Sequence, residues 1–171
     1  MKKRIFLLLA CFALFQSEGQ NRGEMPFEFN KGDTVPEIAL KDSSGQILRL
    51  SSLKGNYVIL NFWGSWCKYC KKRNEELLKI YKKRSKQKYF EIFSVAFDED
   101  RADWIRIIRK DSVLWKYNVR DAEGKKSKLF IKYGLLGVPY TILLDKEGKV
   151  REVDLKEENI EKIIDHLFLE Q

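Results

Sequence analysis

The sequence predicts an α/β domain that covers about residues 32–171, because segments typical of strands alternate with segments typical of helices. Two apolar runs, Tyr57–Trp63 and Phe90–Phe97, are each followed by a segment in which apolar residues recur with helical spacing. The chain of 171 residues is 44% hydrophobic and 34% charged, which is ordinary for a globular domain and argues against a disordered or fibrous class. No internal repeat or linker is visible, so we expect one domain.

The first predicted element is a β-hairpin. Its two strands, Glu37–Leu40 and Gln46–Leu50, are short alternating segments, and the turn-forming run Asp42–Gly45 separates them. A second turn, Leu53–Asn56, precedes the run at Tyr57–Trp63, whose continuous apolar character suits a strand at the centre of a sheet covered on both faces. The domain is therefore expected to open with two short strands before the central one.

The predicted helix after this central strand follows two cysteines. Its apolar stripe consists of Cys70, Leu77, Leu78 and Tyr81, at positions i, i+7, i+8 and i+11. The second cysteine of the pair is therefore expected to face inward. A second helix is expected after the strand Phe90–Phe97, because the acidic residues Asp98–Asp100 come directly before it.

The C-terminal third of the domain is expected to add a helix, a hairpin and a last helix. A looser segment, Asp111–Ser127, leads to a short helix that ends at Tyr133, where Gly134 suits a C-cap. Thr141–Asp145 and Lys149–Val153 read as the strands of a hairpin. The apolar stripe of the last helix consists of Ile160, Ile163, Ile164 and Leu167.

The first residues have the layout of a secretory signal peptide: a basic start, Lys2–Arg4, then the apolar run Ile5–Phe15, then small or polar residues. The run is too short to span a bilayer as a helix, so a retained anchor is the weaker interpretation. We expect cleavage before Gln20, which makes residues 1–19 the signal peptide and residues 20–31 a flexible lead. The mature protein is then exported, with the periplasm of a Gram-negative cell as the expected location.

A second processing site competes with this one. Leu8-Leu9-Ala10-Cys11 loosely resembles the lipobox of bacterial lipoproteins, and cleavage there would leave Cys11 lipidated at the new N-terminus. The apolar run before this cysteine is very short, which favours the first site. We expect the protein to be bound to a membrane only if Cys11 is lipidated.

The charge of the chain does not indicate a nucleic-acid partner. Removal of residues 1–19 takes away three basic residues and one acidic residue, so the net charge falls from +8 to +6. The remaining lysines and arginines are spread over every predicted helix, and the longest basic run, Tyr81–Lys88, lies at a helix end, where cations suit the helix dipole. We therefore interpret them as residues of solvated faces.

After processing before Gln20, the chain keeps two cysteines, Cys67 and Cys70. A structural disulfide between them would close a very small loop, and stabilisation by loop closure shrinks with loop length. A structural zinc site needs four ligands, whereas the chain offers these two cysteines and one histidine, and covalent haem attachment needs histidine where Lys71 stands. Redox exchange is the use for which two cysteines suffice, without a metal or an organic cofactor.

The position of Cys67 supports redox exchange. It lies where the strand ends and the helix begins, so its thiolate would face unpaired backbone N–H groups and the positive end of the helix dipole. Such an environment lowers the pKa of a thiol from about 8.5 toward 7 or below. Lys68, Lys71 and Lys72 add positive charge nearby. Cys67 is therefore the predicted attacking sulfur, and Cys70 the thiol that resolves the mixed disulfide.

Several ordered motifs of this chain resemble the thioredoxin superfamily. Trp66-Cys67-Lys68-Tyr69-Cys70 follows a buried strand, and Gly137-Val138-Pro139-Tyr140-Thr141 precedes a later one. Three further segments are similar to the exported TlpA/ResA-like branch: Gly32–Pro36, Asn61–Cys67 and Leu144–Lys149. So is the inserted strand and helix before Tyr133. The resemblance runs from about Gly32 to the C-terminus.

The resemblance implies a thioredoxin-like fold, with a central mixed sheet flanked by helices, an N-terminal β-hairpin and an inserted strand-helix element. It implies that Pro139 is cis and lies beside the cysteines, and that Val138 lends backbone groups to a substrate chain. Trp66 is a candidate substrate contact. The resemblance also implies that Asn61 stands where cytosolic thioredoxins bury an aspartate that moves protons for the inner cysteine. Because an amide cannot do so, the proton acceptor for Cys70 stays open.

The expected function is that of a thiol-disulfide oxidoreductase that reduces protein disulfides outside the cytoplasm. Its expected partners are protein disulfide substrates and an upstream membrane electron donor, and the sequence does not decide the oligomeric state. A peroxiredoxin is the first alternative, but its peroxidatic cysteine requires Pro seven residues and Thr or Ser three residues earlier, where Leu60 and Gly64 precede Cys67. The second alternative is a thioredoxin-like binding or chaperone module whose cysteines no longer turn over.

Overall fold

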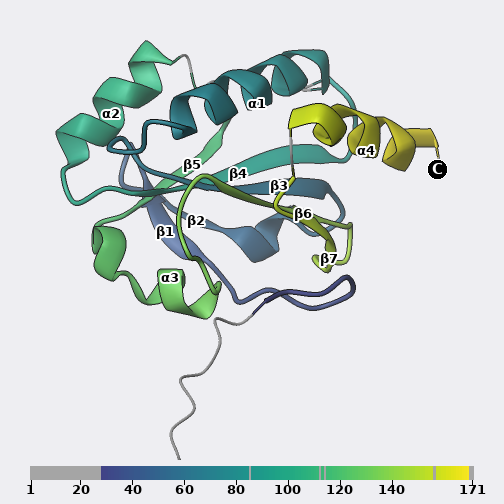
Figure 1. The fold of residues 1–171 in the computed structure, drawn as a ribbon, viewed down its shortest axis with the longest axis horizontal. Helices are drawn as coiled ribbons and strands as arrows, with labels where there is room; N and C mark the ends of the chain where they lie inside the picture. The colour runs from purple at the N-terminus through teal and green to yellow at the C-terminus, as the bar shows by residue number, and fades with distance from the viewer. Residues whose placement is uncertain (1–27, 85, 112, 114, 156, 170–171) are drawn as a thin grey trace, which may run out of the picture.

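The computed structural model describes residues 28–169 other than 85, 112, 114 and 156, and it contains a seven-stranded sheet with helices on both faces (Figure 1). The strands are β1 (Ala39–Asp42), β2 (Ile47–Arg49), β3 (Tyr57–Trp63), β4 (Phe90–Phe97), β5 (Tyr117–Asp121), β6 (Tyr140–Leu144) and β7 (Val150–Val153). The helices are α1 (Cys70–Arg84), α2 (Arg101–Lys110), α3 (Lys128–Lys132) and α4 (Glu157–Leu169), with 3-10 turns η1 (Leu50–Leu53) and η2 (Gly124–Lys126). The predicted signal peptide and Cys11 lie outside the described residues.

The sheet is mixed, as the resemblance implied. Its strand order is β2-β1-β5-β4-β3-β6-β7. Strand β3 pairs in parallel with β4, from Tyr57 opposite Phe90 to Trp63 opposite Ala96, and pairs antiparallel with β6 on its other side. Strand β4 also pairs in parallel with β5. The two longest apolar runs therefore form the middle of the sheet, and β3 ends where the cysteines begin.

The predicted N-terminal hairpin is confirmed, with β1 and β2 antiparallel. Asp42 shapes the turn, because its Oδ1 accepts hydrogen bonds from the backbone N–H groups of Ser44 at 2.8 Å and Gln46 at 2.9 Å. Gly45 has a φ of 93°, which glycine adopts at little cost. The hairpin joins the rest of the sheet because β1 also pairs antiparallel with β5.

Strand β5 lies within the segment that the residue pattern marked only as loose. It pairs with β4 from Tyr117 opposite Phe93 to Asp121 opposite Phe97. Asn118 and Asp121 are buried although they are polar, which hides the strand from an analysis of hydrophobic periodicity. With α3, which follows it, β5 fits the inserted strand-helix element implied by the resemblance.

Both faces of the sheet are covered. Helices α1 and α4 pack on one face, where their side chains form a core with alternate residues of β3 and β4 (Figure 1). That core includes Ile59, Leu77, Ile80, Ile92, Leu143, Ile160, Ile164 and Leu167. The opposite face carries α3 and the N-terminal segment, and its core includes Leu60, Phe62, Phe93, Val95, Phe97 and Tyr133. A third cluster joins α2 to the cysteine region and includes Trp63, Cys70, Ala96 and Trp104.

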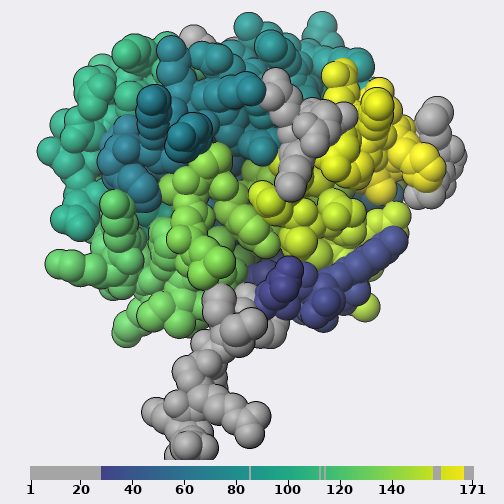
Figure 2. Space-filling view, viewed as in Figure 1, coloured from purple at the N-terminus to yellow at the C-terminus, as the bar shows by residue number. Residues whose placement is uncertain are grey.

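The N-terminal segment runs beside β7 before it reaches β1. The N–H of Gly32 donates to the carbonyl of Val150 at 2.7 Å, and the N–H of Val150 donates to the carbonyl of Asp33 at 2.9 Å. Figure 2 shows these purple N-terminal residues lying against the yellow-green segment that contains β7. Phe29 is buried, and the centroid of its ring lies 5.5 Å from the centroid of the Tyr133 ring. The packed part of the chain therefore begins before Gly32.

Candidate active site

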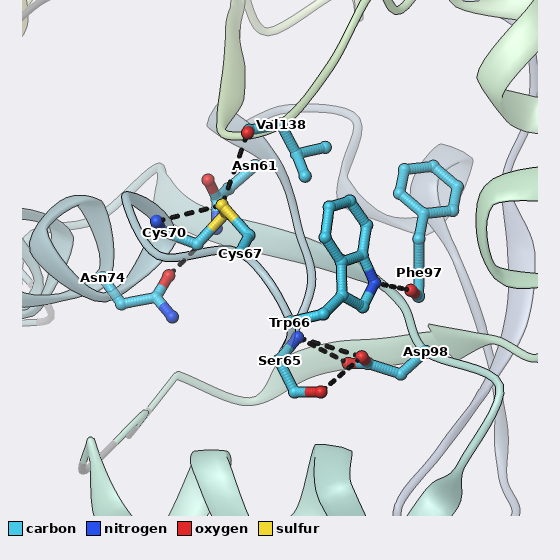
Figure 3. Close-up of a disulfide and its surroundings, with 9 residues drawn as sticks. All are labelled: Asn61, Ser65, Trp66, Cys67, Cys70, Asn74, Phe97, Asp98 and Val138. Carbon is cyan, nitrogen blue, oxygen red and sulfur yellow. Dashed lines mark hydrogen bonds between the residues drawn. A yellow bond between two sulfur atoms is a disulfide. The ribbon is translucent and has the colours of Figure 1, made fainter.

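Cys67 and Cys70 are joined by a disulfide at the carboxyl end of β3 (Figure 3). Their Cα atoms are 5.3 Å apart. Cys67 is half-buried, whereas Cys70 is 1% exposed and packs against Trp63, Ala96 and Trp104. The predicted inward orientation of the second cysteine is therefore confirmed.

The helix begins three residues later than expected. Helix α1 begins at Cys70 rather than at Cys67, because the residues between the two cysteines form a turn in which the N–H of Cys70 donates to the carbonyl of Cys67 at 3.3 Å. The same N–H of Cys70 also points at the Cys67 sulfur, with 3.1 Å between N and Sγ. A backbone N–H at the start of the helix thus faces the Cys67 sulfur, as expected from the sequence, but it belongs to Cys70 and is shared with the Cys67 carbonyl.

A buried carboxylate fixes the turn before the cysteines. The Ser65 N–H donates to Asp98 Oδ1 at 2.9 Å, and the Ser65 hydroxyl donates to the same oxygen at 2.7 Å (Figure 3). Asp98 follows β4 and is 2% exposed. Burial raises the pKa of Asp98 above its ordinary value, while the hydrogen bonds from Ser65 act in the opposite direction. Sequence reasoning treated Asp98 only as the acidic entry to a helix and missed this role.

Trp66 lies at the surface next to the disulfide and is 46% exposed. Its Nε1 donates to the carbonyl of Phe97 at 2.7 Å (Figure 3). Lys125 places its Nζ 4.1 Å from the centroid of the indole ring. Gly64 packs so closely under the indole that a Cβ at this position would lie 2.7 Å from Trp66 Cε2. The indole is thus held in one orientation with part of its surface open to solvent.

Amides and hydroxyls lie behind the disulfide. Asn61 is fully buried on β3, and its Nδ2 donates to Ser94 Oγ at 3.2 Å and to Asn74 Oδ1 at 3.4 Å. Trp115 Nε1 also donates to Ser94 Oγ, at 2.9 Å. None of these side chains carries a carboxylate, so this network offers no acceptor for the Cys70 proton.

Two glutamates of α1 also lie near the cysteines in sequence, and both make ion pairs. Glu75 is exposed, and its Oε1 lies 3.7 Å from Lys71 Nζ. Glu76 lies 3.2 Å from Arg73 Nη1, and both of these side chains are mostly buried. Both glutamates are thus engaged by cations of the same helix.

The loop between α3 and β6 faces the disulfide. The peptide bond between Val138 and Pro139 is cis, as the resemblance implied. The carbonyl oxygen of Val138 lies 3.3 Å from Cys67 Sγ (Figure 3). The structure therefore brings Cys67, Cys70, Trp66, Val138 and Pro139 together at one end of the sheet.

Within the described part of the chain, no group of three or more His, Cys, Asp and Glu residues is placed to hold a metal ion. The helices described are also all too short or too polar to cross a membrane. The arrangement of strand, CxxC turn, helix and facing Val138–Pro139 loop defines a thioredoxin-fold protein with a dithiol-disulfide centre.

Comparisons with known proteins agree with this class. Residues 31–153 match the model of the AhpC/TSA family. The thiol-disulfide oxidoreductase ResA of Bacillus thuringiensis subsp. konkukian is 31% identical over 169 residues, which cover 95% of this chain and 91% of that protein. The chain belongs to the AhpC/TSA family and to its branch of thiol-disulfide oxidoreductases.

Two solved structures support the same fold. The thioredoxin domain of a thiol-disulfide oxidoreductase from Bacteroides vulgatus superposes with a TM-score of 0.76 at 28% identity, and the match covers 82% of this chain and 99% of that one. A thiol-disulfide oxidoreductase from Bacteroides fragilis gives a TM-score of 0.74 at 31% identity, with coverage of 79% and 99%. The predicted thioredoxin-like fold is therefore confirmed.

Proposed function

We propose that this protein reduces disulfides in other proteins outside the cytoplasm, with Cys67 as the nucleophile and Cys70 as the resolving thiol. The observation that carries the assignment is the unequal burial of the two sulfurs, since Cys67 is half-buried and Cys70 is 1% exposed. An incoming disulfide can reach the outer sulfur but not the inner one. The N–H of Cys70, 3.1 Å from Cys67 Sγ, would stabilise a thiolate at Cys67 in the reduced protein.

The reaction then has two exchanges. The Cys67 thiolate attacks one sulfur of the substrate disulfide, a mixed disulfide forms, and the other substrate sulfur leaves as a thiolate. Cys70 loses its proton and attacks Cys67 Sγ, which forms the Cys67–Cys70 disulfide and releases the second substrate thiol. The substrate gains two electrons and the protein loses two.

The surface around Cys67 suits an extended protein segment. Trp66 offers an apolar face, and the Val138–Pro139 loop offers backbone groups beside the reacting sulfur. Tyr69 is 73% exposed and Leu136 is 88% exposed, and each lies within three residues of the site in sequence. We assign Trp66, Val138 and Pro139 to substrate binding, as the sequence suggested, and add these two side chains as further apolar contacts.

The oxidised protein must be reduced again by a donor of two electrons, and an exported protein would receive them from a thiol carrier at the membrane. Export itself rests on the sequence of residues 1–19, whose basic start and apolar run are those of a signal peptide. The lipidated alternative at Cys11 would place the same domain on the outer surface of that membrane. A fusion of residues 1–31 to a reporter enzyme, with and without Cys11→Ser, tests both.

Trapping experiments test the roles of the two cysteines. With Cys11 replaced by serine, the Cys70→Ala protein should accumulate mixed disulfides with partner proteins, because nothing resolves them. The matched Cys67→Ala protein should accumulate almost none, since its remaining thiol is buried. Equal trapping by both variants would contradict the assignment.

Activity assays separate this function from the two alternatives. The protein should accelerate the reduction of insulin by dithiothreitol, and the acceleration should disappear in both cysteine variants. A binding or chaperone module would leave insulin reduction at the uncatalysed rate. A peroxiredoxin would instead consume hydrogen peroxide with dithiothreitol as reductant.

A further inference from the structure

Cys70 must lose a proton before it can attack Cys67, and its surroundings make this difficult. It is 1% exposed and packs against Trp63 and Trp104. An apolar environment disfavours the charged form of a thiol, so the proton is held more tightly than in water. The buried polar side chains beside it in Figure 3, Asn61 and Asn74, are amides and cannot accept it at neutral pH. Resolution of the mixed disulfide therefore requires another acceptor.

One cavity connects Cys70 to a carboxylate. It has a volume of about 240 Å³ and lies between the cysteine turn, the start of α1 and the end of α2. The titratable side chains that line it, among the described residues, are Cys67, Lys68, Cys70, Lys71, Lys110 and Asp111. A lysine ammonium group donates hydrogen bonds and has no acceptor site. Among the described residues that line the cavity, Asp111 is thus the one that carries a carboxylate.

We propose that Asp111 is the proton acceptor for Cys70 during resolution of the mixed disulfide, acting through water in this cavity. The inference rests on the proposed function, because the step exists only if Cys70 resolves a mixed disulfide. The Cys70 thiol proton passes to the Asp111 carboxylate, and the Cys70 thiolate attacks Cys67 Sγ. The bond between Cys67 and the substrate sulfur breaks, the substrate leaves as a thiolate, and Asp111 later gives its proton to solvent.

The position of Asp111 suits this task. It follows the last residue of α2, and its backbone N–H donates to the carbonyl of Ile107 at 2.9 Å, so the residue is held at the helix end. Burial raises the pKa of Asp111, Lys71 and Lys110 lower it, and Glu75 raises it. A carboxylate with a raised pKa is a stronger base, while the two lysines favour its ionised form.

The other acids near the site are engaged elsewhere. Asp98 does not line the cavity, and both of its oxygens accept from Ser65. Glu75 is exposed beside Lys71, and Glu76 pairs with Arg73. Neither glutamate lines the cavity. The choice of Asp111 therefore follows from the cavity rather than from proximity in sequence.

Rapid kinetics with the disulfide reagent DTNB isolates the resolving step. In the full chain with Cys11→Ser, Cys67 attacks the reagent in a bimolecular phase that releases one coloured thiolate. Cys70 then attacks Cys67 in a unimolecular phase that releases the second. Asp111→Asn should slow the second phase roughly tenfold at neutral pH, which is less than the roughly 10²–10⁴-fold typical of general acid–base catalysis, because water enters the cavity. The rate should recover only at a pH above about 8.5, the ordinary pKa of a free thiol, because the buried Cys70 thiol holds its proton more tightly than a thiol in water.

Two variants serve as controls. Glu75→Gln removes a negative charge that lies 3.7 Å from Lys71 but outside the cavity, and it should change the second phase less than about twofold. Asp111→Glu should restore much of the rate. A second phase that is unchanged in Asp111→Asn, or slowed by the same factor at every pH, would overturn the inference. If the unsubstituted protein gives no second phase at all, the proposed roles of the cysteines fail instead.

Discussion

Replacing Ser65 by alanine tests how strongly the Asp98 carboxylate holds the turn before the cysteines. The substitution removes the hydroxyl that donates to Asp98 Oδ1 at 2.7 Å and leaves the backbone N–H at 2.9 Å. A hydrogen bond to a charged group contributes about 1.5–3 kcal/mol. Because Ser65 is only half-buried, water can replace part of the loss, and we expect about 1.5–2 kcal/mol at pH 7.

The loss of unfolding free energy caused by Ser65→Ala should be larger at neutral pH than at acidic pH. Burial raises the folded-state pKa of Asp98 above its unfolded-state pKa. The free energy of unfolding therefore falls as the pH rises from the unfolded-state pKa through the folded-state pKa of Asp98. The Ser65 hydroxyl favours the ionised form, and its removal raises the folded-state pKa further. The difference in unfolding free energy between the two proteins is therefore fully present above both folded-state pKa values. It shrinks as the pH falls through them.

Urea unfolding of the oxidised proteins at pH 7 and at about pH 4 measures this difference. For a domain of this size, 1.5–2 kcal/mol corresponds to a fall in Tm of about 3–8 °C. In a background with Asp98→Asn, which cannot ionise, Ser65→Ala should cost about half as much at pH 7 and should lose its pH dependence. A cost below about 0.5 kcal/mol, or an equal cost at both pH values, would refute the reasoning.

Two further predictions concern the surroundings of the disulfide. Lys68→Gln should raise the alkylation midpoint of Cys67 in the reduced protein by roughly 0.3 pH unit at low salt and less at high salt. Lys71→Gln should have a smaller effect, because Lys71 lies 3.7 Å from Glu75, and equal shifts would contradict this. Gly64→Ala should lower Tm by a few degrees, since its Cβ would lie 2.7 Å from Trp66 Cε2 and displace the indole from its hydrogen bond. An unchanged Tm would show that the indole adjusts freely.

The parts of the fold that could be predicted from sequence are those fixed by local pattern. The bounds of β3 and β4 match the two apolar runs, because a strand buried on both faces shows its full length in its hydrophobicity. The residue pattern alone missed strand β5, which the family resemblance implied, because Asn118 and Asp121 are buried although they are polar. The burial of these two residues depends on tertiary contacts, and hydrophobic periodicity along the sequence carries no information about them.

The same distinction applies to the site. The CxxC pair and the Val138–Pro139 loop were found because their signals are local motifs. The contact between Ser65 and Asp98 joins residues 33 positions apart, and the contribution of Asp111 depends on a cavity between two helices. A serine and two aspartates have no distinctive sequence context, so only the folded chain identifies their roles.

The N-terminal segment beside β7 has a consequence for how molecules of this protein meet. An open sheet ends in two strands whose unpaired backbone groups can bind the strands of another molecule, which leads to domain exchange or aggregation. Here one edge strand, β2, has only three residues. In the other edge strand, β7, the carbonyl of Val150 accepts a hydrogen bond from Gly32, and its N–H donates one to Asp33. Neither border offers a long, free template, so a concentrated solution of the folded domain should resist strand-mediated self-association.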